Sequence, residues 1–268
     1  MTETARDLQG VEQILIDPFV IGGNTAKLKV LLELHRRMSH RRHLNILDVG
    51  CVGLKPLEFW ESLLDRHEFH LTGVDVYGID HARAIVKRQG WERKVTLLEG
   101  SGYDLTSLVG TSSFDVVIAT QVFEHVARLA KLLKQVTAVM AVHGEAFFTL
   151  DSAHWRSRYE WRQPIRAFKN VAKKALSLVG KEQHYDLPWY DSEVVAACEL
   201  AGLAVQSCRY YNVAHLKWIH NRVLAKEAKN SFLMRWFQLE EFLNDVAPGA
   251  RDAREYFACL YIHALKTS

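Results

Sequence analysis

Two acidic residues stand at the ends of apolar runs, and their positions indicate a ligand site. Asp48 lies at the end of one run and precedes a turn with Gly50 and Gly53, and Asp75 ends a second run one strand–helix–strand step later. Glycine lets the backbone turn tightly and approach a ligand, and a helix start offers free N–H groups. An acid at the tip of a second strand can accept hydrogen bonds from both hydroxyls of a ribose. These residues predict a ribose-containing ligand, and an ordinary strand–loop–helix without a ligand is the competing interpretation.

A series of strands is needed to bring these acids together. Buried parallel strands read as continuous apolar runs, and open α/β sheets bind ligands at the carboxyl ends of their strands. Five such runs follow one another, which predicts an α/β fold with the ligand at one edge of the sheet. The first run begins at Asn45, and the others cover 71–75, 95–101, 114–120 and 144–150.

The order of these motifs resembles a known family. Leu47-Asp48-Val49-Gly50-Cys51 is similar to the L-D-V-G-C-G signature, and Glu124-His125-Val126 follows the fourth run, as in class I S-adenosylmethionine-dependent methyltransferases of the type 11-like group. The resemblance covers 40–152, resumes at 184–206 and returns at 256–265. It implies a Rossmann-like seven-stranded sheet of order 3-2-1-4-5-7-6 with helical insertions. It also implies the cofactor S-adenosyl-L-methionine.

Two loops depart from the family pattern. Val52 stands where D-x-G-x-G-x-G has its second glycine, Gly53 is one place out of register, and Ser101-Gly102 replaces the usual Gly-Asp after strand three. The altered glycine loop motivates an alternative hypothesis, a non-catalytic binding or scaffold protein that retains the fold. A nicotinamide oxidoreductase is disfavoured because the chain has no G-x-G-x-x-G motif.

The resemblance implies a set of cofactor contacts. Residues of the first loop would line the methionine part, the acid after strand two would take the ribose hydroxyls, and its neighbours would flank the adenine. Residues after strands three and four would reach the adenine edge and the sulfonium side. The predicted contacts are Asp48, Gly50, Gly53, Asp75, Val76, Tyr77, Ser101, Gly102, Thr120 and Gln121.

His125 is the predicted catalytic residue. Methyl transfer needs an aligned donor and acceptor, and a hydroxyl acceptor must also lose a proton. A partly exposed imidazole near its usual pKa of about 6.5 accepts a proton at neutral pH. We expect residues 121–126 to begin a helix that turns Glu124 and His125 toward the cleft rim or solvent. A purely structural role for this segment is the competing interpretation.

The same segment resembles a metal motif. An E-x-x-E-H arrangement binds a divalent ion in ubiquinone-pathway O-methyltransferases and small-RNA 2′-O-methyltransferases. Gln121 replaces the first acid here, so we predict no metal. Asp151, His154 and His184 are further candidates for the acceptor side, although a lone histidine is more often structural.

The composition fits one large α/β domain with additions. The chain has 268 residues, 49% of them hydrophobic, and its net charge of +3 does not by itself indicate nucleic acid. We expect N-terminal helices over 1–44 that cap the domain, and a methyltransferase domain over 45–268 with insertions at 153–190 and 213–247. The four cysteines lack metal spacing, and neither a signal segment nor an apolar run of about 18 residues is present. A cytoplasmic protein with reduced thiols is therefore expected.

The two insertions bear on the acceptor. Residues 165–179 read as a basic amphipathic helix. Such a helix would cover the active-site mouth, touch an anionic membrane surface or bind an anionic substrate, and we favour the first of these roles. The apolar stripe of 213–247, on one long helix or two, suits core packing or a homodimer contact. The family type and these insertions suggest O-methylation of a small molecule or glycan.

Overall fold

The protein is described by a computed structural model over residues 23–41, 43–52, 57–155, 187–246 and 253–267. The helix expected near the N-terminus, the basic helix over 165–179 and His184 lie outside these residues. No helix in the described ranges is both long and apolar enough to cross a membrane.

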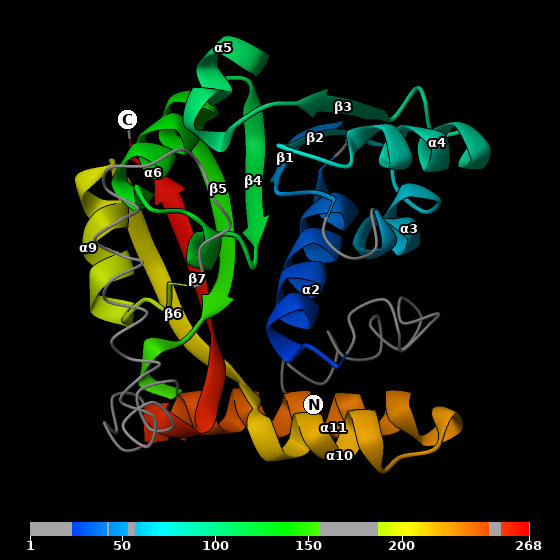
Figure 1. Ribbon diagram of the computed structural model, residues 1–268, viewed down its shortest axis with the longest axis vertical. Helices are drawn as coiled ribbons and strands as arrows, with labels where there is room; N and C mark the ends of the chain where they lie inside the picture. The colour runs from blue at the N-terminus through cyan, green and yellow to red at the C-terminus, as the bar shows by residue number, and fades with distance from the viewer. Residues whose placement is uncertain (1–22, 42, 53–56, 156–186, 247–252, 268) are drawn as a thin grey trace.

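A seven-stranded sheet forms the centre of the molecule, with the predicted order β3-β2-β1-β4-β5-β7-β6 (Figure 1). Neighbouring strands from β3 to β5 run parallel, and β7 pairs antiparallel with both β5 and β6. The carboxyl ends of β1, β2 and β4 therefore meet at one edge. The strands are β1 (Leu44–Val49), β2 (Phe69–Asp75), β3 (Val95–Glu99), β4 (Phe114–Thr120), β5 (Met140–Asp151), β6 (Leu203–Val213) and β7 (Phe257–Lys266).

Helices cover both faces of the sheet and produce two apolar clusters. One cluster joins α2 (Thr25–His40), α3 (Glu58–Leu64), α4 (Ile79–Gln89) and α11 (Lys226–Val246) to the strands. The other joins α5 (Leu105–Val109), α6 (Leu129–Val139) and α9 (Asp191–Leu200) to the opposite face. This two-sided burial explains why the central strands read as continuous apolar runs.

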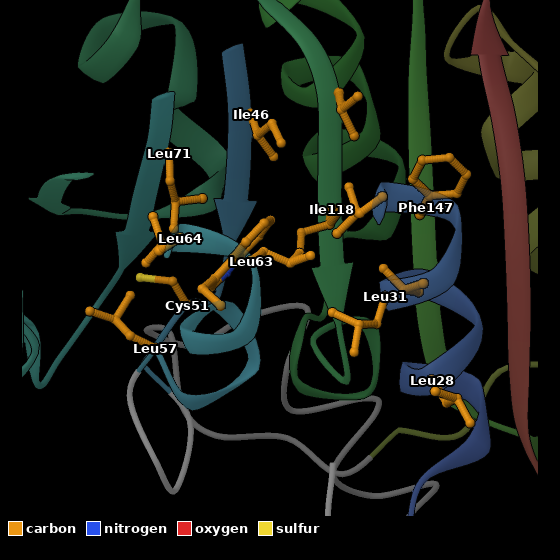
Figure 2. Close-up of a cluster of buried hydrophobic side chains, with 14 of the residues drawn as sticks. Leu28, Leu31, Ile46, Cys51, Leu57, Leu63, Leu64, Leu71, Ile118 and Phe147 are labelled. Atoms are coloured by element: carbon orange, nitrogen blue, oxygen red, sulfur yellow. The ribbon is translucent and has the colours of Figure 1, made fainter. Parts of the chain in front are cut away.

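The first cluster fixes α2 on the middle of the sheet. Figure 2 shows Leu31 of α2 near Ile118 of β4, with Leu28 further along the helix, and both belong to one buried cluster with Phe147 of β5. These side chains are almost fully buried. Burial of such a side chain contributes about 1.5–3 kcal/mol to folding, so α2 is held by packing along its length.

The segment between β6 and β7 forms two helices, α10 (Ala214–Arg222) and α11. They lie together at the end of the molecule toward which β4 points (Figure 1). Glu240 anchors α11, because its carboxylate accepts hydrogen bonds from Val213 N (2.7 Å), Trp236 Nε1 (2.6 Å) and Thr25 Oγ1. The predicted apolar stripe is partly core, since Leu233 and Trp236 are buried.

The expected helix directly after β4 is wrong. Gln121 adopts a left-handed backbone with φ +60°, and only a short 3₁₀ turn, η2 (Phe123–His125), follows. Val126 then returns to extended backbone, so the regular helix α6 does not begin until Leu129. The reversal at Gln121 prevents a helix from continuing out of the strand.

Candidate functional site

The turn after β1 brings the ends of three strands together. Gly50 has φ +78° and donates its N–H to Val74 O at 2.8 Å. A Cβ at this position would lie 2.5 Å from Val122 Cγ2, beyond the end of β4. Only glycine satisfies both the positive φ and this close approach, which accounts for the one glycine that matches the family pattern.

Val52 occupies the place of a family glycine without disrupting the loop. Its side chain is buried, and its backbone N–H donates to Asp75 Oδ2 at 3.0 Å. Gly78, with φ +73° at the start of α4, leaves the space into which the Val52 side chain packs. The altered loop is therefore a well-packed structure as far as Val52, and Gly53 lies outside the described residues.

Asp75 is buried at the tip of β2 with both carboxylate oxygens in use. Oδ2 accepts from Val52 N and Oδ1 from Val76 N at 2.8 Å. Each carboxylate oxygen has further acceptor capacity, so two ribose hydroxyls still find acceptors there. Val76 and Tyr77, the predicted adenine neighbours, follow directly and are about half exposed.

Asp48 is a buried carboxyl group that is only half satisfied. Trp60 Nε1 donates to its Oδ2 at 2.6 Å, whereas Oδ1 has no hydrogen-bond partner among the described residues. Burial raises the pKa of Asp48 to about 7; the Trp60 hydrogen bond and Lys27 lower this pKa, and Asp75 raises it. An unpaired buried acceptor costs about 1–3 kcal/mol, so the site favours a ligand that donates to Oδ1.

The loops after β3 and β4 complete the predicted contacts. Ser101 Oγ accepts from Tyr103 N at 3.2 Å and starts the 3₁₀ turn η1 (Gly102–Asp104). A Cβ at Gly102 would lie 2.8 Å from Leu132 Cδ1, so this loop packs closely on α6. Thr120, the last residue of β4, is partly exposed.

Gln121 leaves β4 in a strained conformation. Its N–H donates to Thr149 O at 2.7 Å, and its side-chain amide approaches Cys259 Sγ at 3.7 Å. A non-glycine residue in the left-handed region costs about 1–2 kcal/mol, and such strain is often found at functional sites. The Gln121 side-chain amide thus lies beside β7.

The two residues expected at the cleft rim, His125 and Glu124, differ in their exposure to solvent. His125 is partly exposed, as predicted, but Glu124 is only 3% exposed, so its predicted position was wrong. Leu187 N donates to Glu124 O at 2.7 Å and Trp189 Nε1 to Phe123 O at 2.8 Å. This returning segment covers η2 and buries Glu124, an interaction between residues too distant in sequence to be read from a helix pattern.

A second cluster of polar side chains surrounds Asp191, and the sequence analysis named only one of its members as a candidate. His154 Nε2 lies 2.9 Å from Asp191 Oδ1, and Arg254 Nη1 donates to Asp191 Oδ2 at 2.8 Å. The Tyr210 hydroxyl also donates to Asp191. Although burial opposes it, the hydrogen bonds from Tyr210, His154 and Ser192 lower the pKa of Asp191. His154 was a candidate, but no sequence signal identified Asp191 as its partner.

The described residues contain no group of three or more His, Cys, Asp or Glu side chains arranged to hold a metal. The prediction that the protein binds no metal is not tested by this observation and stays a prediction.

A family model described as a methyltransferase domain matches residues 25–226. None of the curated protein sequences matches the chain significantly.

Solved structures share the fold at low sequence identity. Geranyl diphosphate C-methyltransferase from Streptomyces coelicolor A3(2), solved with Mg²⁺, geranyl diphosphate and S-adenosyl-L-homocysteine, has 12% identity and a TM-score of 0.55, with 87% of this chain and 78% of that chain covered. Phosphoethanolamine N-methyltransferase 2 from Haemonchus contortus, solved with S-adenosyl-L-methionine, has 13% identity and a TM-score of 0.55, with 90% and 53% covered. The [4+2]-cyclase SpnF has 12% identity and a TM-score of 0.54, with 89% and 80% covered. At these identities the similarity is one of fold.

Proposed function

The chain belongs to the methyltransferase-domain family and is an S-adenosylmethionine-dependent methyltransferase, and from this premise we propose that it methylates a hydroxyl oxygen of a small molecule or glycan. The observation that supports the cofactor part of the proposal is the pair of buried acids at adjacent strand ends, joined through one loop. Asp75 holds Val52 N in that loop, and Asp48 has an oxygen that a ligand can satisfy.

The cofactor supplies an electrophilic methyl group on a sulfonium. Asp75 would accept the ribose hydroxyls, with Val76 and Tyr77 beside the adenine. Asp48 Oδ1 would accept a hydrogen bond from the ammonium group of the methionine part, which satisfies the otherwise unpaired oxygen. Gly50 would allow the backbone to approach the cofactor. The chain thus offers a polar group for each polar part of the cofactor.

His125 would accept the proton of the acceptor hydroxyl at a ring nitrogen. It is partly exposed on η2, and Leu187 N and Trp189 Nε1 fix this turn by donating to its backbone oxygens. A base held in one place loses little entropy when the acceptor binds. This arrangement supports proton removal, and therefore an oxygen acceptor, more than it supports methylation of an amine that is already neutral.

Calorimetric titration tests the cofactor assignment directly. S-adenosylhomocysteine should show saturable binding, and NAD should show none. Glu92→Ala is a suitable control variant, because Glu92 is exposed in the turn before β3, at the amino end of the strands and opposite the site. Binding of NAD without binding of S-adenosylhomocysteine would overturn the proposal.

A non-catalytic binding protein is the second candidate function. It is motivated by Val52 in the glycine loop, although the packing of Val52 on Gly78 removes the steric objection to a formed site. The two functions differ in one readout. The binding protein would take up S-adenosylhomocysteine but never form it from S-adenosylmethionine with any acceptor.

Three further expectations stay predictions. We propose that residues 1–44 cap the methyltransferase domain at 45–268, that the protein is cytoplasmic, and that two copies can associate. Leu239, Phe242 and Val246 are exposed on α11 and are the surface to mutate in a test of the dimer by analytical ultracentrifugation. Membrane contact through 165–179 concerns residues outside the described ranges.

A further inference from the structure

The second half of α11 turns its acids toward the rest of the protein. Glu240 is fully buried. Glu241 Oε2 lies 2.9 Å from Lys29 Nζ of α2, and Asp245 Oδ1 lies 3.1 Å from Arg209 Nη2 of β6. The exposed negative charges of this half are therefore paired with cations of the protein itself.

The rest of this helical hairpin, residues 214–239, is strongly basic. It has five lysines and arginines and one acid, Glu227, so its net charge is +4, against +3 for the whole chain. Arg222 and Arg235 are exposed, and neither forms an ion pair with any residue in the ranges that the structure describes. This part of the surface therefore carries the positive charge excess of the chain.

Two large apolar side chains lie exposed among these bases. Trp218 of α10 is 62% exposed, and Val223, in the turn between the helices, is 57% exposed. Trp218 and Arg222 are four residues apart and so share the outer face of α10. The opposite face carries Leu216, which packs against the core, and the buried His220. The core therefore already covers one face of α10, and the face with the tryptophan is a surface of its own.

We propose that the outer face of α10 and the turn into α11 dock on an anionic lipid bilayer. Trp218 and Val223 would lie at the level of the lipid headgroups, and the bases beside them, Arg222 and Lys226, would contact lipid phosphates. The contact is peripheral, since no helix in the described ranges is long and apolar enough to cross a membrane. This inference goes beyond the proposed function and does not depend on it.

The combination of side chains favours a lipid surface over two other partners. Each base near an anionic bilayer raises the affinity by about fivefold, and a tryptophan ring prefers the membrane–water interface. A second copy of the chain would bring the same positive surface against itself, which like charges oppose. A nucleic acid would contact the bases and can stack on Trp218, but it gives Val223 no role.

The position of the hairpin relates this surface to the cofactor edge. The helices α10 and α11 lie across the end of the molecule toward which β4 points (Figure 1). The strands β1 and β2, which end near Asp48 and Asp75, run parallel to β4. The proposed docking face and the cofactor edge therefore belong to the same end of the protein.

Flotation of the full chain with lipid vesicles tests the proposal. One vesicle is phosphatidylcholine alone, and the other contains about one-third phosphatidylglycerol, which supplies the negative surface potential. A first double variant, Trp218→Ser with Val223→Ser, removes the apolar side chains. A second, Arg222→Gln with Lys226→Gln, removes two charges. Urea unfolding checks that each variant is folded, and the exposure of all four residues favours this.

Two control variants make the same kinds of change elsewhere on the surface. Leu200→Ser removes an apolar side chain that is 81% exposed at the end of α9. Lys87→Gln with Arg88→Gln removes two exposed charges from the last turn of α4. Single-stranded RNA is the competing polyanion, and analytical ultracentrifugation measures self-association in every variant.

We expect the wild type and both controls to bind the anionic vesicles about tenfold or more tightly than the neutral ones, with binding weakened by salt. Both test variants should bind the anionic vesicles about tenfold more weakly than the controls.

Three results would overturn the proposal. If the test variants bind vesicles as the controls do, or the wild type binds none, this face is not a lipid-docking surface. If the wild type prefers RNA to anionic vesicles and only the charge variant loses binding, the partner is a nucleic acid. If the Trp218→Ser, Val223→Ser variant instead dissociates a dimer that the wild type forms and leaves vesicle binding unchanged, the face is an interface between two copies.

Discussion

Val52 fills the space above Gly78: a Cβ on Gly78 would lie only 2.7 Å from Val52 Cγ1. The two residues belong to the turns after β1 and β2, the turns that carry Asp48 and Asp75. The bulky residue in the glycine loop is thus matched by a residue without a side chain in the neighbouring loop. This pairing is how the site keeps its shape with one family glycine missing.

The first prediction concerns this contact. Gly78→Ala should destabilise the protein more than Gly90→Ala, by about 1–3 kcal/mol. Both glycines flank α4 with nearly equal φ, +73° and +72°, so both substitutions incur the left-handed penalty of about 1–2 kcal/mol. A Cβ at Gly90 meets nothing within 4 Å, which makes Gly90→Ala the control for strain without overlap. Urea unfolding measures the difference, and Val52→Ala should recover part of it. Equal losses in the two variants would contradict the steric account.

The second prediction concerns Asp75. Asp75→Ala should weaken binding of S-adenosylhomocysteine by about 1.5–3 kcal/mol, because hydrogen bonds to a charged acceptor are the stronger class. It should also lower the free energy of unfolding, since Asp75 accepts from Val52 N and Val76 N inside the protein. Calorimetry and urea unfolding separate the two effects, with Glu92→Ala as the exposed control at the opposite end of the strands. An unchanged dissociation constant would show that Asp75 is not the ribose acceptor.

The third prediction concerns His125. His125→Ala should leave S-adenosylhomocysteine affinity unchanged and lower turnover by about 10²–10⁴-fold, the range for loss of general acid–base help. His81→Ala, on the exposed face of α4, is the control. If turnover in the variant matches the wild type, a structural role for His125 is the better account.

The fourth prediction concerns stability against pH. The pKa of Asp48 is about 7 in the folded protein, above its usual value of 3.8, because the group is buried. Between about pH 4 and pH 7 the folded state therefore keeps a proton that the unfolded state has already lost. Because of this difference, the contribution of Asp48 to the free energy of unfolding falls as pH rises through that window. Asp48→Asn should reduce the fall by about 1–3 kcal/mol between pH 5 and pH 8, which urea unfolding measures.

Glu240 is the comparison for this pH effect. Burial raises the pKa of Glu240 to about 7 as well, against its hydrogen bonds from Thr25, Val213 and Trp236. Glu240→Gln should therefore also flatten the pH dependence, but without changing the affinity for S-adenosylhomocysteine. If Asp48→Asn leaves the unfolding profile as steep as that of the wild type, Asp48 is not the titrating group.

The fold was predictable because local patterns and burial agree. The apolar run 114–120 matches β4 in full, and the acids at the ends of β1 and β2 fall at the edge where parallel strands meet. Such features depend on neighbours in the sequence and on a sheet covered on both faces.

The parts of the site that sequence reasoning missed are set by long-range contacts. Asp191 is joined to His154 across 37 residues, and Leu187 N donates to Glu124 O across 63 residues of sequence. Glu124 was misplaced because a helix was assumed after β4, whereas the left-handed Gln121 ends the regular backbone. None of these relationships leaves a periodic signal.

The hydrogen bonds of Thr25 determine when the site can be completed during synthesis. Its partners, Asn212 and Glu240, lie 187 and 215 residues further along the chain. The strands that carry Asp48 and Asp75 emerge from the ribosome long before those partners do. The hydrogen bonds that tie the first turn of α2 to β6 and α11 therefore form only after most of the protein has been made, when both acidic strand ends are already available to fold.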